Sequence, residues 1–262
     1  MSSAEGGPGL AGLPREEAIP RLVDEVGPRL FRLASRVCGD PGDAEDIVQE
    51  TFLQAWRKWD QFEGRSSAAS WLFTIAARLC RRMHRRRAGE PARRLSLDEL
   101  LPFAEPTMPD LEGGVEAQVR REAQERLEDA MTGLPLVYRL PLVLKEIAGL
   151  GYAEIASILG IRLGTAKSRV HRGRLELRKA VDRTLPRRPG TDPAYPRQVC
   201  LDLLQAKQEA MDRGVPMAET VVCERCRAVF ASLDLTQDLC RRVAIGDLPA
   251  DVRKRILAGL ER

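Results

Sequence analysis

Residues 151–177 read GYAEIASILGIRLGTAKSRVHRGRLEL, a pattern that indicates two helices joined by a short turn. Apolar residues recur at helical spacing up to Leu159, and Gly160 can leave the helix through a positive φ angle at a tight turn. A second helix opens at Gly164 or Thr165 and continues with apolar residues at three- and four-residue spacing. The order of helix, glycine turn and helix predicts a helix-turn-helix pair.

The outward face of the second helix is basic and polar. Arginine and lysine donate hydrogen bonds to phosphates and guanine edges, and serine can bond to either. Apolar helical hairpins with a glycine turn also occur as plain packing, but the basic face favours DNA. His171 is interpreted as a phosphate or base contact, since no partner metal ligand lies nearby in sequence. The candidate DNA-contacting residues are Thr165, Lys167, Ser168, Arg169, His171, Arg172 and Arg174.

The composition of the whole chain is that of a soluble globular protein. Its 262 residues include 42 Lys or Arg and 38 Asp or Glu, a net charge of +4, with 44% hydrophobic and 5% aromatic residues. No apolar run approaches the roughly 20 residues of a membrane helix. Residues 1–13 lack the basic start and apolar stretch of a signal peptide. We therefore expect no membrane association, and a reducing cytoplasm for the six cysteines.

The mild net charge conceals two basic segments. One spans 162–179 and the other spans 81–94, whereas residues 190–262 carry equal numbers of acidic and basic side chains. Two separate basic stripes suggest two contacts with a polyanion, although isolated arginine runs are often only solvated helix faces. The segment at 81–94 contains Arg81, Arg82, Arg85, Arg86, Arg87, Arg93 and Arg94.

Proline and glycine clusters divide the chain. Residues 88–113 and 186–196 are rich in these breakers and read as linkers, while the segments between them show helical periodicity and no convincing strand alternation. The sequence therefore predicts an all-α protein of three units, 15–87, 114–185 and 197–262.

Several motifs in the first two units resemble one family. Residues 43–53 read DAEDIVQETFL, residues 62–64 read FEG, and residues 71–76 read WLFTIA before the first arginine run. Together with GYAEIA at 151–156 and GTAKSR at 164–169, they resemble regions 2 and 4 of bacterial extracytoplasmic-function (ECF) RNA polymerase sigma factors, over about residues 15–185.

This resemblance implies a transcription initiation factor that is not an enzyme. Core RNA polymerase would bind the first unit at Asp46, Gln49, Glu50 and Phe52. Promoter DNA would be contacted at the −10 element by Arg81, Arg82, Arg85 and Arg86, and at the −35 element by the helix-turn-helix. From the residues alone, the acidic face at 43–50 reads rather as an ordinary solvated helix surface, and its paired carboxylates lack the pocket pattern of a glycosidase.

The third unit adds four cysteines that a two-domain sigma factor does not need. Cys223 and Cys226 form a C-x2-C pair, and Cys200 and Cys240 could complete a four-sulfur site if helices 197–213, 217–232 and 236–244 form a small bundle. Thiolate ligands favour zinc or cadmium, with copper as a further candidate. A structural zinc site, a sensory metal site, a thiol redox switch and inert buried cysteines all remain open.

The third unit also resembles two known arrangements. In the zinc-binding anti-sigma fold a histidine precedes the C-x2-C pair, and here Glu219 occupies that position as a candidate weak oxygen ligand. Metal-dependent (CorE-type) sigma factors carry a Cys-rich extension that senses metal in cis, which would make a separate anti-sigma protein unnecessary. The alternative function is a DNA-binding regulator with a structural zinc or a redox switch. Cys38 and Cys80 lie on apolar helix faces, where inert packing is expected.

Overall fold

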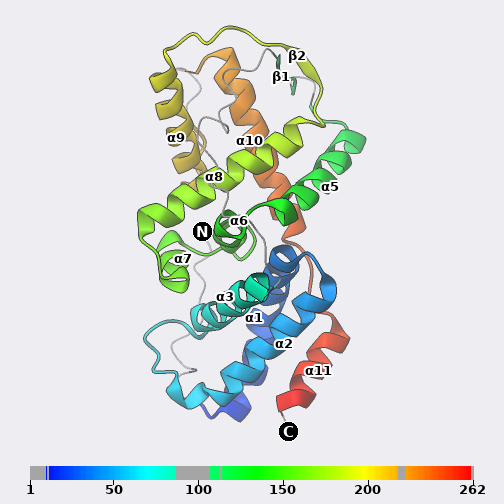
Figure 1. The fold of residues 1–262 in the computed structure, drawn as a ribbon, viewed down its shortest axis with the longest axis vertical. Coiled ribbons are helices and arrows are strands. Elements are labelled where there is room, and N and C mark those ends of the chain that lie inside the picture. Colours follow the sequence, from blue (N-terminus) through cyan, green and yellow to red (C-terminus); the bar gives the residue numbers. More distant parts are fainter. Residues whose placement is uncertain (1–9, 11, 87–106, 112–113, 218–221, 261–262) are drawn as a thin grey trace. The chain divides into compact units, whose positions relative to one another are not determined.

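The computed structural model describes residue 10 and residues 12–86, 107–111, 114–217 and 222–260, and in these ranges the chain is helical apart from two short strands. The predicted all-α fold is confirmed (Figure 1). None of the described helices combines the length and the apolar character that crossing a bilayer requires. Two compact units are formed, and each draws on segments that are distant in sequence.

The first unit comprises Met1–Ala92, Pro135–Lys167 and Ala244–Arg262. Its centre is formed by α1, α2 and α3, whose apolar faces pack on one another and bury Leu33, Phe52 and Phe73 completely. The helices of this unit are α1 (Arg15–Cys38), α2 (Pro41–Arg57), the 3-10 turn η1 (Trp59–Gln61), α3 (Ala68–Arg86), α6 (Leu136–Glu146), α7 (Tyr152–Leu159) and α11 (Ala250–Leu260).

Local sequence signals set the junction between α1 and α2. Gly39 ends α1 at φ 79°, a conformation that costs glycine little. Asp40 then caps α2, because its Oδ1 accepts a hydrogen bond of 3.0 Å from the Asp43 backbone N–H, and Pro41 fits the first helical position. The helix that carries the acidic motif therefore starts at a well-defined residue.

Two arginines attach the α6 region to α1. The buried Arg139 donates through Nη1 to the Val37 carbonyl at 3.0 Å. Arg29 donates through Nη2 to the Ala148 carbonyl at 2.6 Å. These bonds satisfy carbonyl groups that would otherwise lose water on burial, and they join residues 102 and 119 positions apart in sequence.

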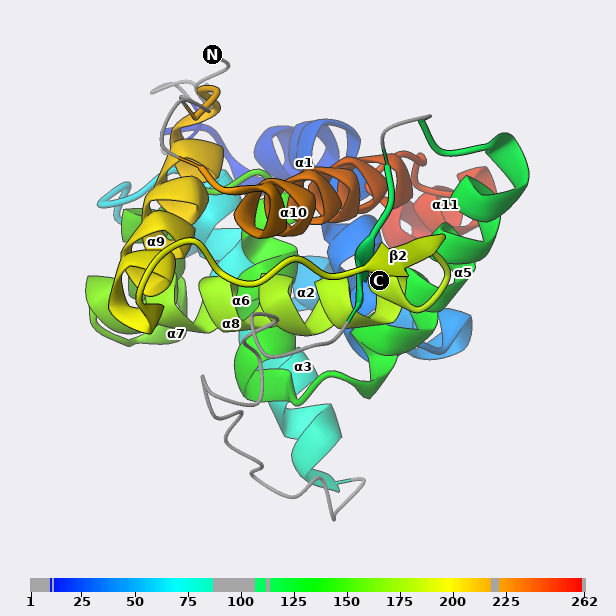
Figure 2. The same ribbon diagram turned by 90° about the horizontal axis from the view of Figure 1, so that it is seen from above.

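The second unit comprises Arg93–Leu134 and Ser168–Val243. Helix α10 packs against α5, α9 and strand β1, and Figure 2 shows α9 beside α10. Its elements are α5 (Ala117–Gly133), most of α8 (Leu163–Asp182), α9 (Arg197–Arg213), α10 (Glu224–Val243) and the strands β1 (Thr107–Pro109) and β2 (Arg187–Pro189).

The two strands were not expected from the sequence. β1 and β2 pair antiparallel, with Met108 opposite Arg188, and thus join the two segments predicted to be linkers. Strands of three residues are too short to show an alternating pattern, and their prolines read as breakers. Arg187 reinforces the pair, since its Nη1 donates to Thr107 Oγ1 at 2.9 Å.

The compact units do not coincide with the three predicted ones. Helix α8 is continuous across the division at Lys167 and Ser168, and α11 belongs to the first unit although its sequence follows the cysteine-rich segment. Breakers mark where the chain leaves a helix, whereas compact units are set by which apolar faces meet. The latter depends on partners far away in sequence.

Candidate functional site

The acidic motif lies on α2, where one side faces the core and the other is accessible. Asp46 is exposed, while Gln49 and Glu50 are half-buried. Gln54 donates through Nε2 to Glu50 Oε1 at 2.7 Å, one turn along the helix. Phe52 is 0% exposed, which corrects its prediction as a polymerase contact: it occupies the inward stripe with Ile47 and Val48.

The basic run at the end of α3 divides into different roles. Arg82 is exposed. Arg81 is half-buried, and its Nη2 donates at 3.0 Å to the carbonyl of Leu159, the last residue of α7. A cation at a helix C-terminus is favourable because unpaired carbonyls gather there. Arg85 and Arg86 belong to α3, but their side chains lie outside the described part of the structure.

Three aromatic rings gather beside the turn before α3. The ring centroids of Trp59 and Phe62 are 5.2 Å apart, and those of Phe62 and Trp71 are 5.1 Å apart. Trp59 is buried and donates through Nε1 to the Leu13 carbonyl at 2.9 Å, while Phe62 and Trp71 are half-buried. The following loop, residues 63–66, is exposed. Phe73, two residues after Trp71, is fully buried in the core.

The predicted helix-turn-helix is present. Helix α7 ends at Gly160, which adopts φ 63° and ψ 43°, and α8 begins at Leu163. Glu154 fixes the start of α7, because its Oε2 accepts from the Gly151 N–H at 2.9 Å. The other carboxylate oxygen accepts from Ser70 Oγ on α3 at 3.1 Å.

The first turns of α8 present the polar face that the sequence predicted. Lys167 and Ser168 are exposed, and Thr165, Arg169 and Arg172 are half-buried. Ala166 and Val170 are fully buried on the opposite side. The helix thus separates an accessible basic surface from an apolar one over residues 165–172.

Two predicted DNA contacts are instead paired with α9. Asp212 Oδ1 accepts from Arg174 Nη1 at 2.6 Å, and Asp212 Oδ2 lies 3.0 Å from His171 Nε2. Arg174 is 3% exposed, so its prediction as an accessible base or phosphate contact is corrected. Burying a guanidinium requires a charged or polar partner, and Asp212 supplies it.

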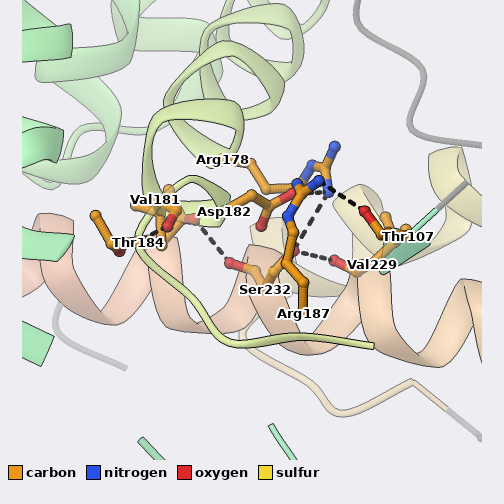
Figure 3. A network of polar contacts seen from close by, with 9 residues as sticks. Thr107, Arg178, Val181, Asp182, Thr184, Arg187, Val229 and Ser232 are labelled. Carbon is orange, nitrogen blue, oxygen red and sulfur yellow. Dashed lines mark hydrogen bonds and ion pairs between the residues drawn. The ribbon is translucent and has the colours of Figure 1, made fainter. Parts of the chain in front are cut away.

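A second buried ion pair follows on α8. Arg178 Nη1 bonds to Asp182 one turn later and lies 3.4 Å from Ser232 Oγ on α10 (Figure 3). Ser232 Oγ in turn donates to the Val229 carbonyl at 3.0 Å. Arg178 is 0% exposed and Asp182 3%. The arginine at the end of the basic segment 162–179 therefore stabilises the fold and is not an accessible DNA contact.

Three of the four C-terminal cysteines gather in the second unit. The Cys226 thiol shares hydrogen bonds with the thiols of Cys223 and Cys200, and Cys200 Sγ also contacts the Tyr195 carbonyl at 3.7 Å. Cys200 and Cys226 are buried, whereas Cys223 is half-buried. As they stand, the described side chains contain no group of three or more His, Cys, Asp or Glu arranged to hold a metal ion.

The three thiols differ in acidity. Burial raises the pKa of Cys226 far above its usual value, and its hydrogen bonds with Cys223 and Cys200 raise it further. Burial also acts to raise the pKa of Cys223, but hydrogen bonds from the backbone N–H groups of Cys226 and Ala194 outweigh it and lower the pKa. Cys223 directly precedes α10, where a helix N-terminus favours the thiolate.

The fourth cysteine does not join this group. Cys226 and Cys240 both belong to α10, which is one unbroken helix, so 14 residues separate them by about 21 Å along the axis. The predicted four-sulfur site assumed a break near residue 235, and the continuous helix corrects it. Glu219, the predicted oxygen ligand, lies outside the described residues.

The remaining cysteines meet between α1 and α3. The pKa of Cys80 lies well above its usual value because its thiol hydrogen-bonds with Cys38 and is buried. Both residues are free thiols in a well-packed interior. This arrangement agrees with the packing role expected from the sequence.

Sequence reasoning missed two side chains that form long-range polar contacts. Asp212 lies in α9, where the sequence pattern points only to Cys200, and Arg139 has no charged neighbour in sequence. A retrospective signal exists for Arg139, which interrupts an apolar run at 134–144 and so had to be buried with a partner. No comparable signal marks Asp212.

The chain matches two family models in the expected order. The model for Sigma-70 region 2 covers residues 22–90, and the model for Sigma-70, region 4 covers residues 124–177. These ranges contain α2, α3 and the helix-turn-helix described above.

Known sigma factors have similar sequences. The chain is 36% identical over 159 residues to the ECF RNA polymerase sigma factor SigE of Mycolicibacterium smegmatis, an alignment covering 60% of this chain and 59% of that protein. It is 33% identical over 168 residues to SigW of Bacillus subtilis, covering 63% of this chain and 89% of SigW. A solved structure of the sigma factor RpoE with the anti-sigma factor NepR from Bartonella quintana is 29% identical, with a TM-score of 0.40, and the match covers 58% of this chain and 89% of that one. The chain belongs to the family of ECF RNA polymerase sigma factors.

Proposed function

We propose that this sigma factor binds core RNA polymerase through the outward side of α2 and positions it at promoters through α3 and the first turns of α8. The observation that carries the proposal is the separation of the two faces of α2. Phe52 is fully buried, while the polar side chains of Asp46, Gln49 and Glu50 remain on the outer side. A charged helix face of this kind suits docking to a protein partner, with charge complementarity setting specificity.

The promoter contacts divide between two surfaces. Lys167 and Ser168 are exposed and Arg169 is half-buried on α8, and these three side chains would contact base edges and phosphates in the −35 element. On α3, the exposed Arg82 would contact phosphates of the −10 element. The half-buried rings of Phe62 and Trp71 lie beside an exposed loop, and unpaired bases stack on such rings in single-stranded DNA complexes.

We further propose that thiolate-seeking metal ions control this activity through Cys200, Cys223 and Cys226. The Cys226 thiol on α10 lies within hydrogen-bonding reach of the thiols of Cys223 and Cys200, and three sulfurs are a donor set that suits zinc, cadmium or Cu(I). The lowered pKa of Cys223 favours its thiolate, the form that binds metal. A bound ion would link α9 to α10 at this point.

The polymerase contact is tested by association of the full chain with bacterial core RNA polymerase. Reversing the charge at two positions, Asp46→Arg with Glu50→Arg, is expected to weaken association by about tenfold or more. Asp60→Arg is the matched control, because Asp60 is equally exposed but lies in η1, beyond the end of α2. Equal association of both variants would contradict the proposed face. DNA binding by a chain that never associates with core polymerase would instead favour a plain DNA-binding regulator.

The metal proposal is tested by titrating the reduced full chain with zinc, cadmium and Cu(I). Stoichiometric binding that is lost in Cys223→Ser and kept in Cys240→Ser is expected, since Cys240 lies on a distant turn of α10. Alkylation of Cys223 gives an independent readout, because metal binding should protect this half-buried thiol. Binding that depends equally on Cys240 would contradict the three-thiol site. Metal binding without any change in polymerase association would leave the site structural, with control assigned to an anti-sigma protein acting in trans.

A further inference from the structure

The last helix of the chain packs on the helix to which the proposed function assigns polymerase binding. Within the first unit, α11 runs beside α2 and also touches α1 (Figure 1). Its apolar residues Val252, Ile256 and Leu260 recur every four positions and are 1%, 1% and 6% exposed. A stripe with this spacing forms one face of a helix, and this face is buried against the first unit.

The contacts of α11 fall on one stripe of α2 that includes a candidate polymerase contact. Arg255 forms a hydrogen-bonded ion pair with Glu45. One turn later, a Cβ placed on Gly259 would lie 3.7 Å from Leu53 Cδ2 and 3.9 Å from Gln49 Nε2, so this glycine faces both side chains. Glu45, Gln49 and Leu53 are spaced by four residues, so α11 follows the stripe over two turns of α2.

A second set of contacts fixes the segment that leads into α11. Leu248 Cδ2 lies 3.0 Å from the position that a Cβ on Gly27 of α1 would occupy, so the leucine packs closely against α1 at this glycine. Arg253 donates from Nε and Nη2 to the two carboxylate oxygens of Asp24 at 2.6 and 3.1 Å. Arg32 donates to the Gly246 carbonyl. These contacts hold α11 in one register on α1 and α2.

The same contacts are weak enough for α11 to detach from α1 and α2. Its charged pairs are exposed at the surface, where ion pairs contribute little, so the buried stripe supplies most of the attachment. Because α11 is tethered to its target, even a weak contact is largely formed at equilibrium. A large interface with a partner protein can displace such a contact, at the cost of a lower apparent affinity.

We propose that α11 is a built-in cap over the Glu45, Gln49 and Leu53 stripe of α2 and competes with core RNA polymerase for it. This inference rests on the proposed function, because it assumes that polymerase binds the outward side of α2. Core polymerase then binds only the uncapped fraction of the chain, and any change that detaches α11 raises the apparent affinity.

The experiment measures the dissociation constant of the full-length chain for core RNA polymerase. Ile256→Asp places a charge in the buried stripe and is expected to tighten binding by about tenfold or more, since burial of an unpaired charge is strongly unfavourable. Ala258→Asp is the control, because Ala258 is exposed on the same helix. A second test uses Arg253→Asp, which should tighten binding by a smaller factor, with wild-type affinity restored by adding Asp24→Arg. The charge exchange guards against an effect of misfolding.

The outcomes separate this inference from the proposed function. If Ile256→Asp and Ala258→Asp bind core polymerase as tightly as the unaltered chain, while Asp46→Arg with Glu50→Arg still weakens binding, the cap is overturned and the proposed polymerase contact stands. Ile256→Asp is also combined with Asp46→Arg and Glu50→Arg. If Ile256→Asp alone tightens binding and the combined variant loses that gain, the cap and the proposed polymerase contact are both supported. If neither the unaltered chain nor any variant binds core polymerase, the cap and the proposed polymerase contact both fail.

Discussion

Helix α8 carries basic residues along its length, and its two halves place them in opposite surroundings. Near its start, Lys167 and Ser168 are exposed. Further along, Arg174 and Arg178 are 3% and 0% exposed and pair with Asp212 and Asp182. One charge pattern thus serves two purposes. A basic segment predicts a DNA surface only where no acidic side chain of the protein covers it.

The largest effect is expected at the buried half. Arg178→Ala removes the partner of a buried carboxylate, and the free energy of unfolding should fall by about 3–5 kcal/mol. Chemical denaturation measures this change. Arg183→Ala is the control, because Arg183 is exposed just beyond the end of α8. A loss at Arg178 no greater than that of the control would contradict a structural role for this arginine.

A smaller loss is expected at the pair with α9. Asp212→Asn keeps the size of the side chain but removes the charge that compensates Arg174, and we expect about 2 kcal/mol of destabilisation. Thermal unfolding of the variant beside Asp202→Asn, an exposed position on the same helix, measures it. Equal unfolding temperatures would show that Arg174 is satisfied in some other way.

At the exposed half the expectation is reversed. Lys167→Ala should change the free energy of unfolding by no more than about 0.5 kcal/mol. The slope of log affinity for promoter DNA against log salt concentration should decrease by about 1, as one phosphate contact is lost. Arg174→Ala, compared in the same titration after correction for its unfolded fraction, should leave the slope unchanged. A larger change of slope for Arg174 than for Lys167 would invert the comparison.

The smallest effect concerns pH at the surface pair of α11. The hydrogen bonds from Arg253 lower the pKa of Asp24, so the pair contributes stability above the usual aspartate pKa and loses it as the pH falls below about 4. Asp24→Asn should therefore unfold at a slightly lower temperature than the unaltered chain at neutral pH. In strong acid the two unfolding temperatures should match. A difference that grows with acidification would have the wrong sign.

The elements of the sigma regions could be predicted because their signals are local. The glycine turn at Gly160, the cap at Asp40 and the buried positions of α2 follow from neighbouring residues. The polar outer face of α8 was predicted only in part. Arg174 does not belong to it, because it pairs with Asp212, which lies 38 residues further along the chain. Such pairings depend on tertiary packing that composition and spacing do not encode.

The cysteine cluster shows the same limit. The C-x2-C spacing placed Cys223 and Cys226 together, and Cys200 lies with them. The error at Cys240 came from expecting two helices, 217–232 and 236–244, where α10 is continuous. The position of α11 on α2 was equally hidden, as its apolar stripe identifies a buried face but not the surface that buries it.

The central claim, that this chain directs core polymerase to promoters, is tested most directly by transcription from a library of randomised upstream sequences. The purified chain and bacterial core RNA polymerase are incubated with the library, and the transcripts are sequenced. We expect transcripts above the level of core enzyme alone, whose templates share two elements at a fixed spacing, and we expect Lys167→Ala to reduce selection of the upstream element. Transcripts no more abundant or selective than those of core enzyme alone, from a chain that binds DNA, would contradict the claim.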